Sequence, residues 1–345
     1  MKKKLVFLFI VCCLTLISCG IPIKPKEDTT TKKEELPTLN VTNNIQNEQS
    51  QVNSSLYTGE QLSKEEMTNL PFMAIIENSS SARPQSGLSE ADLVYETMAE
   101  GGIPRFFALF QKNSPQKIGP IRSIRPYFIS IAQEYSLPFA HCGGSNEALN
   151  SIKDNTSIKS INEIVNSSYF WRDTKRKAPH NLYTSSDKIR KFILDKNLQS
   201  NGASFLRFDD KFWDNPPLQT ANEVSLKLNI SYTTSYIYKN NKYIKNMDGK
   251  ESFDANNNTP LAFTNIVVQK TPVKLQEDKL HLDITLVGSG DGYIFSKGKV
   301  KKIKWNKKSA ESPTEIIDEQ GNKLSLAKGN TIWHIIDKNI EPSFK

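Results

Sequence analysis

Short apolar runs of strand length recur along the chain beyond residue 70. Three of them are nearly continuous, and a fourth alternates polar with apolar positions. Runs of four to eight such residues are typical of β-strands. The pattern therefore predicts strands at residues 72–76, 92–96, 105–110 and 137–141.

Segments with helical spacing separate these runs. We expect a helix over residues 120–135, because Pro120 is tolerated in a first turn. Asn146 is placed to cap a short helix that follows it, and Ser185 or Ser186 is placed to cap another. Strands that alternate with helices predict a mixed α/β domain.

From residue 223 onward the pattern becomes that of antiparallel strands. Residues 224–230 and 282–286 alternate strictly between apolar and polar side chains, and residues 239–242 form a hairpin-like turn. The fold class predicted for the whole chain is α+β. A mixed α/β domain at residues 58–215 is followed by a smaller, mostly antiparallel β domain at residues 216–345.

The N-terminus has the pattern of a bacterial signal peptide. Three lysines precede an apolar run at residues 5–17, which is too short for a comfortable membrane span. Ser18-Cys19 then resembles a lipobox, which implies cleavage after residue 18 and lipidation of Cys19 with acyl chains such as palmitate. The alternatives are an uncleaved anchor and a secretory signal in which Cys19 stands by chance.

Residues 19–57 have the composition of a tether. They contain three prolines, a mixed-charge run and an Asn/Gln/Ser/Thr tract, with few large apolar residues. Such a segment cannot offset its ordering entropy by burial, so we expect it to be disordered. The chain is thus predicted to be a lipid-anchored lipoprotein on the extracytoplasmic face of the cell membrane.

Net charge limits the classes of partner that we expect, and the cysteine count limits the disulfides. Removal of residues 1–18 lowers the formal charge from +8 by three lysines to +5, and leaves Cys142 as the one thiol besides Cys19. A mild positive charge outside the cell favours an anionic wall polymer or lipid head groups over nucleic acid. With one free thiol, the mature chain is expected to form no internal disulfide.

Two arginines follow Gly119-Pro120 at a spacing of three. If a helix begins there, Arg122 and Arg125 share its first turn, where cations oppose the helix dipole. A bound anion would explain that placement. The alternative is a structural network in which each arginine pairs with Asp92, Glu96 or Glu100.

Two stretches are rich in basic side chains. Residues 171–177 follow Trp171 with arginines and lysines, and we interpret them as a positive rim beside Arg122 and Arg125 or as a solvated loop. Residues 297–308 hold seven lysines. For these we favour an edge strand protected by charge over a polymer-binding stripe.

Two of the four histidines are candidates for acid–base chemistry. His141 and His180, together with Glu96, could serve as general acid and base, although His141 could equally be a buried turn residue. A metal site is not predicted, because there is no His-x-x-x-His and no Cys pair. Cys142 and Ser145 are weak candidates for a nucleophile. No cofactor is predicted, since the sequence lacks a phosphate loop, a dinucleotide fingerprint and a nucleophile elbow.

Several separate motifs follow one another along the chain: Ile76–Asn78, Arg83–Leu88, Ala91–Glu96, Glu100–Gly102, Gly119–Arg125, His141–Ser145 and Ala178–Tyr183. Together they resemble those of the YerB-type lipoproteins, a bacterial family with a two-part domain of unknown function. The resemblance covers about Leu70 to Asp337. It implies an envelope lipoprotein and no mechanism. The usual turn in that family reads His-x-Gly-Gly-Ser, so Cys142 occupies its variable position.

The sequence leaves three functions open. The first is a lipoprotein that binds an anionic envelope ligand or a partner protein through an arginine-rich cleft. The second is an extracytoplasmic hydrolase of wall material with a His/Glu site, and the third is a scaffold without a ligand. The predicted ligand-binding residues are Arg83, Arg105, Arg122, Arg125, His141, Ser145, His180 and Asn181, and the predicted catalytic residues are Glu96, His141 and His180.

Overall fold

The computed structural model describes residues 53–214 and 218–345. The predicted signal peptide, Cys19 and most of the predicted tether therefore lie outside the described residues, as does the predicted boundary at residues 215 and 216. The fold takes in residues ahead of the predicted boundary at residues 57 and 58, because Tyr57 is fully buried and its ring contacts that of Tyr135.

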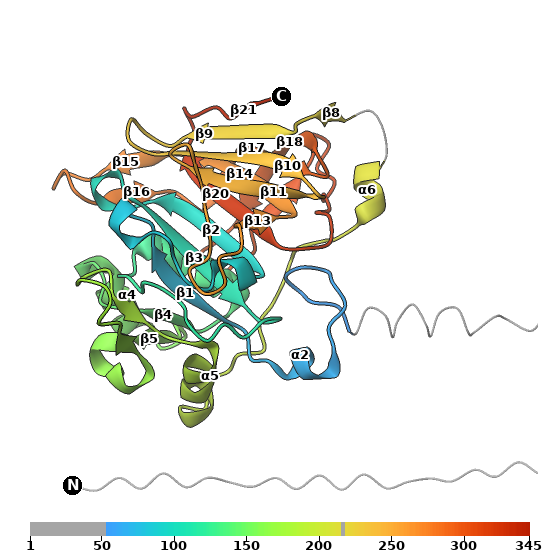
Figure 1. Ribbon diagram of the computed structural model, residues 1–345. Helices are drawn as coiled ribbons and strands as arrows, with labels where there is room; N and C mark the ends of the chain where they lie inside the picture. The colour runs from blue at the N-terminus through green and yellow to red at the C-terminus, as the bar shows by residue number, and fades with distance from the viewer. Residues whose placement is uncertain (1–52, 215–217) are drawn as a thin grey trace, which may run out of the picture. The chain divides into compact units, whose positions relative to one another are not determined.

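A mixed sheet of eleven strands runs through both predicted regions (Figure 1). Most neighbours in it are antiparallel, but β14, β20 and β2 are parallel, as are β1, β4 and β5. In sheet order its strands are β19 (Glu315–Ile317), β18 (Lys299–Lys307), β17 (Gly288–Ser296), β14 (Asn265–Thr271), β20 (Thr331–Asp337), β2 (Leu93–Met98), β3 (Pro104–Phe110), β1 (Phe72–Glu77), β4 (Phe139–His141) and β5 (Ser160–Asn162), with β8 (Gln219–Thr220) beside β18.

Strand β20 joins the two regions. It lies between β14 of the second region and β2 of the first, so that Trp333 is the register partner of both Val267 and Tyr95. In Figure 1 the blue and teal strands β1–β3 continue in this way into the orange and red strands β14 and β20. The residues from the two regions therefore share one hydrogen-bonded sheet.

A smaller sheet of six strands is formed by the second region alone. The predicted hairpin at residues 239–242 is confirmed, with Asn240 and Asn241 both at positive φ in its turn. Its strands are β12 (Lys250–Glu251), β11 (Lys242–Met247), β10 (Thr233–Lys239), β9 (Glu223–Lys227) and β21 (Ser343–Phe344), with β13 (Ala262–Phe263) beside β11. Two further two-stranded ribbons are β15 (Val273–Leu275) with β16 (Leu282–Ile284), and β6 (Trp171–Arg172) with β7 (Leu182–Tyr183).

Helices are short and lie mostly in the first region. Ser185 caps α5, as one of the two predicted alternatives has it, whereas α4 is capped by Ser145 and not by Asn146. The α-helices are α2 (Lys64–Thr68), α3 (Pro126–Tyr135), α4 (Asn146–Asp154), α5 (Ser186–Asp195) and α6 (Asp210–Asp214), and the 3-10 turns are η1 (Ser80–Ala82), η2 (Leu88–Glu90), η3 (Glu100–Gly102), η4 (Glu163–Val165) and η5 (Ser167–Tyr169).

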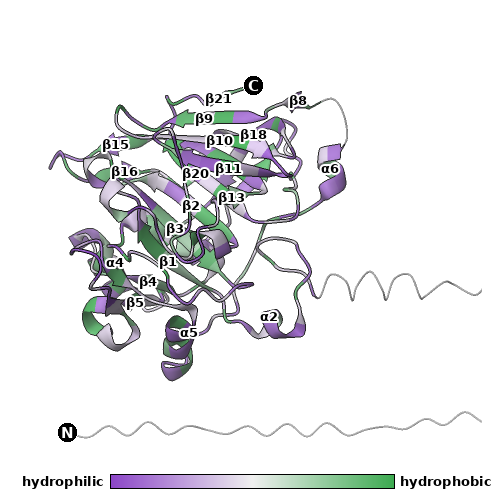
Figure 2. Ribbon diagram, in the orientation of Figure 1, coloured by the Kyte–Doolittle hydropathy of each residue, from purple (hydrophilic) through white to green (hydrophobic). Residues whose placement is uncertain are grey.

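Strands β1 and β3 of the large sheet are buried on both faces, which explains why they are continuous apolar runs in the sequence. Successive residues of a strand point to opposite faces. Ile76 therefore packs in a core with the smaller sheet and α5, whereas Ile75 packs in a second core with α3. Figure 2 shows hydrophobic residues along β1 and β3 in the middle of the fold. The predicted α+β class is confirmed.

The helix predicted to open at Pro120 is wrong in its start. Residues 119–125 run extended beside β1, where Arg122 N donates to Ile75 O at 3.0 Å, and α3 begins only at Pro126. The residue before a proline disfavours helical dihedrals, so Arg125 serves as the extended N-cap. Arg122 and Arg125 therefore do not share a helical turn, and the dipole argument for an anion between them fails.

The lysine-rich strand is not an edge strand. Strand β18 pairs with β17 on one side and with β19 and β8 on the other. Its Lys307 is buried and donates to Glu134 Oε2 at 2.7 Å. The sequence shows the lysines but not the carboxylate that one of them meets.

Candidate functional site

The end of β1 divides the motif residues into two groups. Glu77 and Asn78 are adjacent in sequence and both buried, and their side chains reach different partners. Glu77 contacts His180, whereas Asn78 donates to Glu96 Oε1 at 2.8 Å. One group lies partly open to solvent and the other is in the interior.

The open group is centred on His180, which the loop between β6 and β7 carries. Its Nδ1 lies 2.9 Å from Glu77 Oε2, and Arg122 Nε lies 3.7 Å from the same oxygen. The side chains of His180 and Arg122 are 26% and 35% exposed, and that of Glu77 is 6% exposed. Within residues 53–214 and 218–345, Nε2 of His180 has no hydrogen-bond partner. A buried carboxylate thus orients a histidine whose other nitrogen faces outward beside an arginine.

Further positive charge lies at the end of β6 and on the same loop. Arg172 Nη1 donates to the side-chain oxygen of Asn181, next to His180, at 2.9 Å. Arg172, Lys175 and Lys177 are exposed, and none of them forms an ion pair in the part of the chain that the structure describes. We call His180, Arg122, Arg172, Asn181 and Glu77 the open cluster. Its positive charges outnumber the one carboxylate.

Arg105 and Arg125 lie apart from the open cluster, in a buried group around Glu100. Arg105 Nη2 donates to Glu100 Oε2 at 2.6 Å, and Arg125 Nε donates to the other carboxylate oxygen. Burial raises the pKa of Glu100, but the hydrogen bond from Arg125 and the two arginine charges outweigh it, so the pKa is lowered overall. Arg125 therefore takes part in a structural ion-pair network with Glu100, which was the alternative to an anion site.

Arg83 belongs to a third group. Its Nη1 donates to Asp248 Oδ2 at 2.6 Å, and its Nε and Nη2 donate to the side-chain and backbone oxygens of Asn78. Asp248 follows β11 of the smaller sheet, so this ion pair spans the two regions. The four arginines therefore line no common cleft.

His141 is a buried structural residue. It is 0% exposed, with Nδ1 at 2.8 Å from Gly143 O and Nε2 at 2.7 Å from Ser160 Oγ. Burial lowers its pKa to about 4. Both nitrogens are occupied within the chain, so His141 and His180 do not form the predicted acid–base pair.

The two weak nucleophile candidates have structural roles. The Cys142 thiol donates to Glu163 Oε2 at 3.2 Å, and burial together with Glu163 raises its pKa to about 11. A thiol with that pKa is a poor source of thiolate. The Ser145 hydroxyl accepts a hydrogen bond from Ala148 N and so caps α4.

Glu96 lies in a buried network between the two sheets. Lys245 Nζ donates to Glu96 Oε2 at 2.8 Å, and His334 Nδ1 lies 3.4 Å from the same oxygen. Tyr236 in turn hydrogen-bonds His334 Nε2 at 2.7 Å. Burial lowers the pKa of both Lys245 and His334. Glu96 is thus no partner of His180 or His141.

The structure brings together Arg122, His180 and Asn181 from the predicted set and adds Arg172 from the basic run. Sequence reasoning missed Glu77 as the carboxylate of this site, although Glu77 ends the apolar run of β1 within a motif. It also missed Lys245. That lysine occupies an inward position of the alternating strand β11, between Tyr243 and Met247, and this was the available signal.

Two findings on the described residues concern metal binding and membrane spans. No group of three or more His, Cys, Asp or Glu side chains among them is arranged to hold a metal. The helices found in this part of the chain are too short or too polar to cross a membrane.

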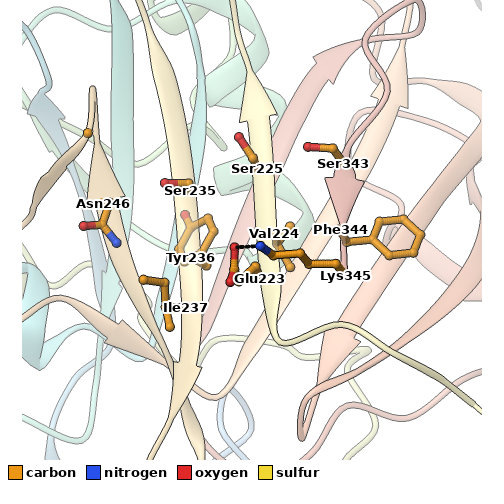
Figure 3. Close-up of a pocket in the computed structure, with 11 residues that line it drawn as sticks. Glu223, Val224, Ser225, Ser235, Tyr236, Ile237, Asn246, Ser343, Phe344 and Lys345 are labelled. Atoms are coloured by element: carbon orange, nitrogen blue, oxygen red, sulfur yellow. Dashed lines mark ion pairs between the residues drawn. The ribbon is translucent and has the colours of Figure 1, made fainter.

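A hollow of about 410 Å³ lies over β9, β10 and β21 of the smaller sheet (Figure 3). Short polar side chains such as Ser225 and Ser235 line it. Glu223 and Lys345 in its wall form an ion pair at 3.0 Å, and both are more than half exposed. An exposed ion pair of this kind contributes little to the stability of the fold. None of the predicted site residues lies here, so the open cluster remains the stronger candidate.

The chain matches two family descriptions in order. Residues 57–199 match "Protein of unknown function (DUF3048) N-terminal domain", and residues 223–333 match the corresponding C-terminal domain. The resemblance noted in the sequence is thereby confirmed, and the two matches leave residues 200–222 between them.

A curated relative and a solved structure agree with these matches. The chain is 31% identical over 279 residues to "Putative lipoprotein YerB" of Bacillus subtilis (strain 168), an alignment that covers 77% of this chain and 81% of the relative. The crystal structure of the YerB protein from Bacillus subtilis superposes with a TM-score of 0.75 at 28% identity, over 84% of this chain and 99% of that one.

Proposed function

The chain belongs to the two-part DUF3048 family, and on that premise we propose that it is a membrane-anchored extracytoplasmic lipoprotein that binds an anionic envelope ligand at the open cluster. The predicted lipobox at Cys19 supplies the anchor. The ligand class is one that carries phosphate or carboxylate groups, because these are the partners that arginine forks recognise. When the ring of His180 is protonated, its Nε2–H adds a further donor.

One observation carries the proposal. His180 is oriented by the buried Glu77 through Nδ1, so its Nε2 faces outward beside the partly exposed guanidinium of Arg122. Glu77, the carboxylate of the open cluster, is already shared by His180 and Arg122. Arg172 and the neighbouring exposed lysines add charge of the same sign. An anion would therefore meet several positive groups at once, and their field would raise its local concentration.

The test is binding to polymers of defined charge. We expect the detergent-solubilised full chain to bind a phosphate-rich teichoic-type polymer and polyglutamate, and not neutral dextran. Arg122→Gln and Arg172→Gln should each weaken binding about tenfold, since a lost charge-assisted contact contributes on the order of 1.5–3 kcal/mol. Lys242→Gln, an exposed lysine of the smaller sheet, is the matched control for charge removal. Equal loss in all three variants would reduce the interaction to net charge and contradict the site.

A second function is favoured by the same histidine. A carboxylate that orients a histidine, with the other nitrogen free, is the arrangement of a general base. An extracytoplasmic hydrolase of wall material would use Glu77 and His180, with Arg122 beside a developing negative charge. In that case Glu77→Gln abolishes release of soluble wall fragments while binding persists. No release by the unaltered chain, measured by mass spectrometry of digested wall, rejects this second function.

A further inference from the structure

A cleft of about 500 Å³ lies where the two regions meet, and none of the residues that line it belongs to the open cluster. That volume is within the range of about 300–1,000 Å³ typical of small-molecule sites, which often form at such joins. From the first region it is lined by five residues between positions 78 and 85 and by Phe106. From the second it is lined by six residues between positions 247 and 253, by Asn258 and by Leu261. Binding here would involve both halves of the chain.

The cleft combines an apolar wall with charges of both signs. Phe106, Met247 and Leu261 are buried apolar side chains that line it, and Phe253 is half-buried. Arg83 and Lys250 supply two positive charges, while Asp248 and Glu251 supply two negative charges. The cleft therefore has no net charge, in contrast to the positive open cluster.

Several of these charged groups keep unused bonding capacity. A guanidinium has five N–H donors, and Arg83 uses three of them, on Asn78 and Asp248. Each carboxylate oxygen of Asp248 accepts one hydrogen bond, from Arg83 and from Thr233 N, and can accept another. Lys250 and Glu251 have no ion-pair partner among the described residues. Charged donors thus remain available on both sides of the cleft, and carboxylate acceptors remain available on the side of the second region.

We propose that this cleft is a second binding site, which takes a short peptide with a free ammonium, a free carboxylate and an apolar side chain. The ligand carboxylate would meet Arg83 and Lys250, and its ammonium would meet Asp248 and Glu251. The apolar side chain would lie against Phe106 and Met247. A polyanion fits the cleft less well, because Asp248 and Glu251 repel it. A purely apolar ligand leaves Lys250 and Glu251 without partners.

The inference is independent of the anionic ligand proposed for the open cluster. It rests on other residues, and the two sites differ in net charge. Variants of one site therefore serve as controls for the other, so that failure of either proposal can be recognised separately.

The experiment uses two pools of tripeptides with the same sequences, each containing one aromatic or aliphatic residue. One pool has free termini, and the other is N-acetylated and C-amidated. Binding to the detergent-solubilised full chain is measured by saturation-transfer NMR and isothermal titration calorimetry. We expect the free pool to bind at least about tenfold more tightly than the blocked pool, which corresponds to about 1.4 kcal/mol.

Variants at the rim assign the site. Lys250→Gln and Glu251→Gln alter exposed side chains, so they should leave the fold intact and each weaken binding by about three- to tenfold. Arg83→Gln should weaken it further, and the two rim variants carry the test if Arg83→Gln does not fold. Arg172→Gln, at the open cluster, should leave peptide affinity unchanged. The proposal is overturned if the blocked pool binds equally well, if Arg172→Gln weakens binding as much as the rim variants, or if no peptide binds at millimolar concentration.

Discussion

His141 and His180 both lie in turns that belong to the family motifs, but the two side chains have different surroundings. His141 is fully buried, both its nitrogens are bonded within the chain, and its pKa is lowered to about 4. His180 is about a quarter exposed; one nitrogen is bonded to a buried carboxylate, and the other has no partner among the described residues. The first histidine stabilises the fold, and the second is placed to meet a ligand.

The arginines repeat this contrast between an interior part and an open part. Arg105 and Arg125 enclose Glu100 with side chains that are about a tenth exposed, whereas Arg122 is 35% exposed and only approaches Glu77. Membership of a motif therefore does not separate structural residues from binding residues. Burial and the number of unused hydrogen-bonding atoms do.

The largest effect is expected at the buried pair of Glu96 and Lys245. Lys245→Met leaves a buried carboxylate without its ammonium, which should lower the free energy of unfolding by about 3–5 kcal/mol. Adding Glu96→Gln to that variant should restore part of the loss, because the uncompensated charge is removed. Urea unfolding measures both variants. Equal stability of the single and double variants would contradict an uncompensated buried charge at Glu96.

The next effect is a pH dependence at His141. Its folded pKa of about 4 lies below the unfolded value near 6.5, so the unfolded chain binds more protons between these values. Stability is therefore lost as the pH falls from about 6.5 to about 4, by about 3 kcal/mol from this group. His141→Gln should lack that part of the loss, whatever its stability at pH 7. Parallel curves of unfolding free energy against pH for the two proteins would contradict a neutral buried His141.

A smaller difference should separate the two neighbouring arginines. Arg125→Ala removes a buried hydrogen-bonded charge while Arg105 still partners Glu100, so we expect a loss of about 2 kcal/mol. Arg122→Ala removes a partly exposed charge and should cost less than about 0.5 kcal/mol. Thermal melts followed by circular dichroism compare the two. A reversed order would make Arg122 the structural residue.

The smallest effect is expected at Cys142, which is next in sequence to His141. Its pKa of about 11 predicts slow alkylation at pH 8, and Cys142→Ala should leave the binding of anionic polymers unchanged. Glu163→Gln should speed alkylation only modestly, because burial is the larger cause of the raised pKa. Rapid labelling of the unaltered chain, followed by mass spectrometry, would contradict the structural role and make Cys142 a candidate nucleophile again.

Local sequence patterns predicted much of the fold. The runs that became β1, β2, β3 and β4, the β10–β11 hairpin and the Ser185 cap follow from spacing that neighbouring residues determine. The start of α3 was misplaced because two prolines compete to open it. The pairing of β20 with β2 was beyond local patterns, since it joins residues more than two hundred positions apart.

The candidate site was predicted in part. Arg122, His180 and Asn181 were named from their motifs, and they do lie together. Which carboxylate meets which cation depends on the tertiary fold, and for that reason Glu77 was overlooked and Glu96 was assigned to the wrong partners. The sequence shows that Lys245 faces inward, but it does not show what the lysine meets.

The position of β20 has a consequence for how the chain folds. This strand lies in the middle of the large sheet, and Thr97 of β2 bonds to Ile335 of β20 across 238 positions of sequence. Until β20 is inserted, β2 and β14 present unpaired edges, which are templates for pairing with other chains. Contacts of such long range give a high contact order and slow folding. We therefore expect refolding on a timescale of seconds, with aggregation competing at high concentration, and a chain shortened before Thr331 to lose the first region along with the second.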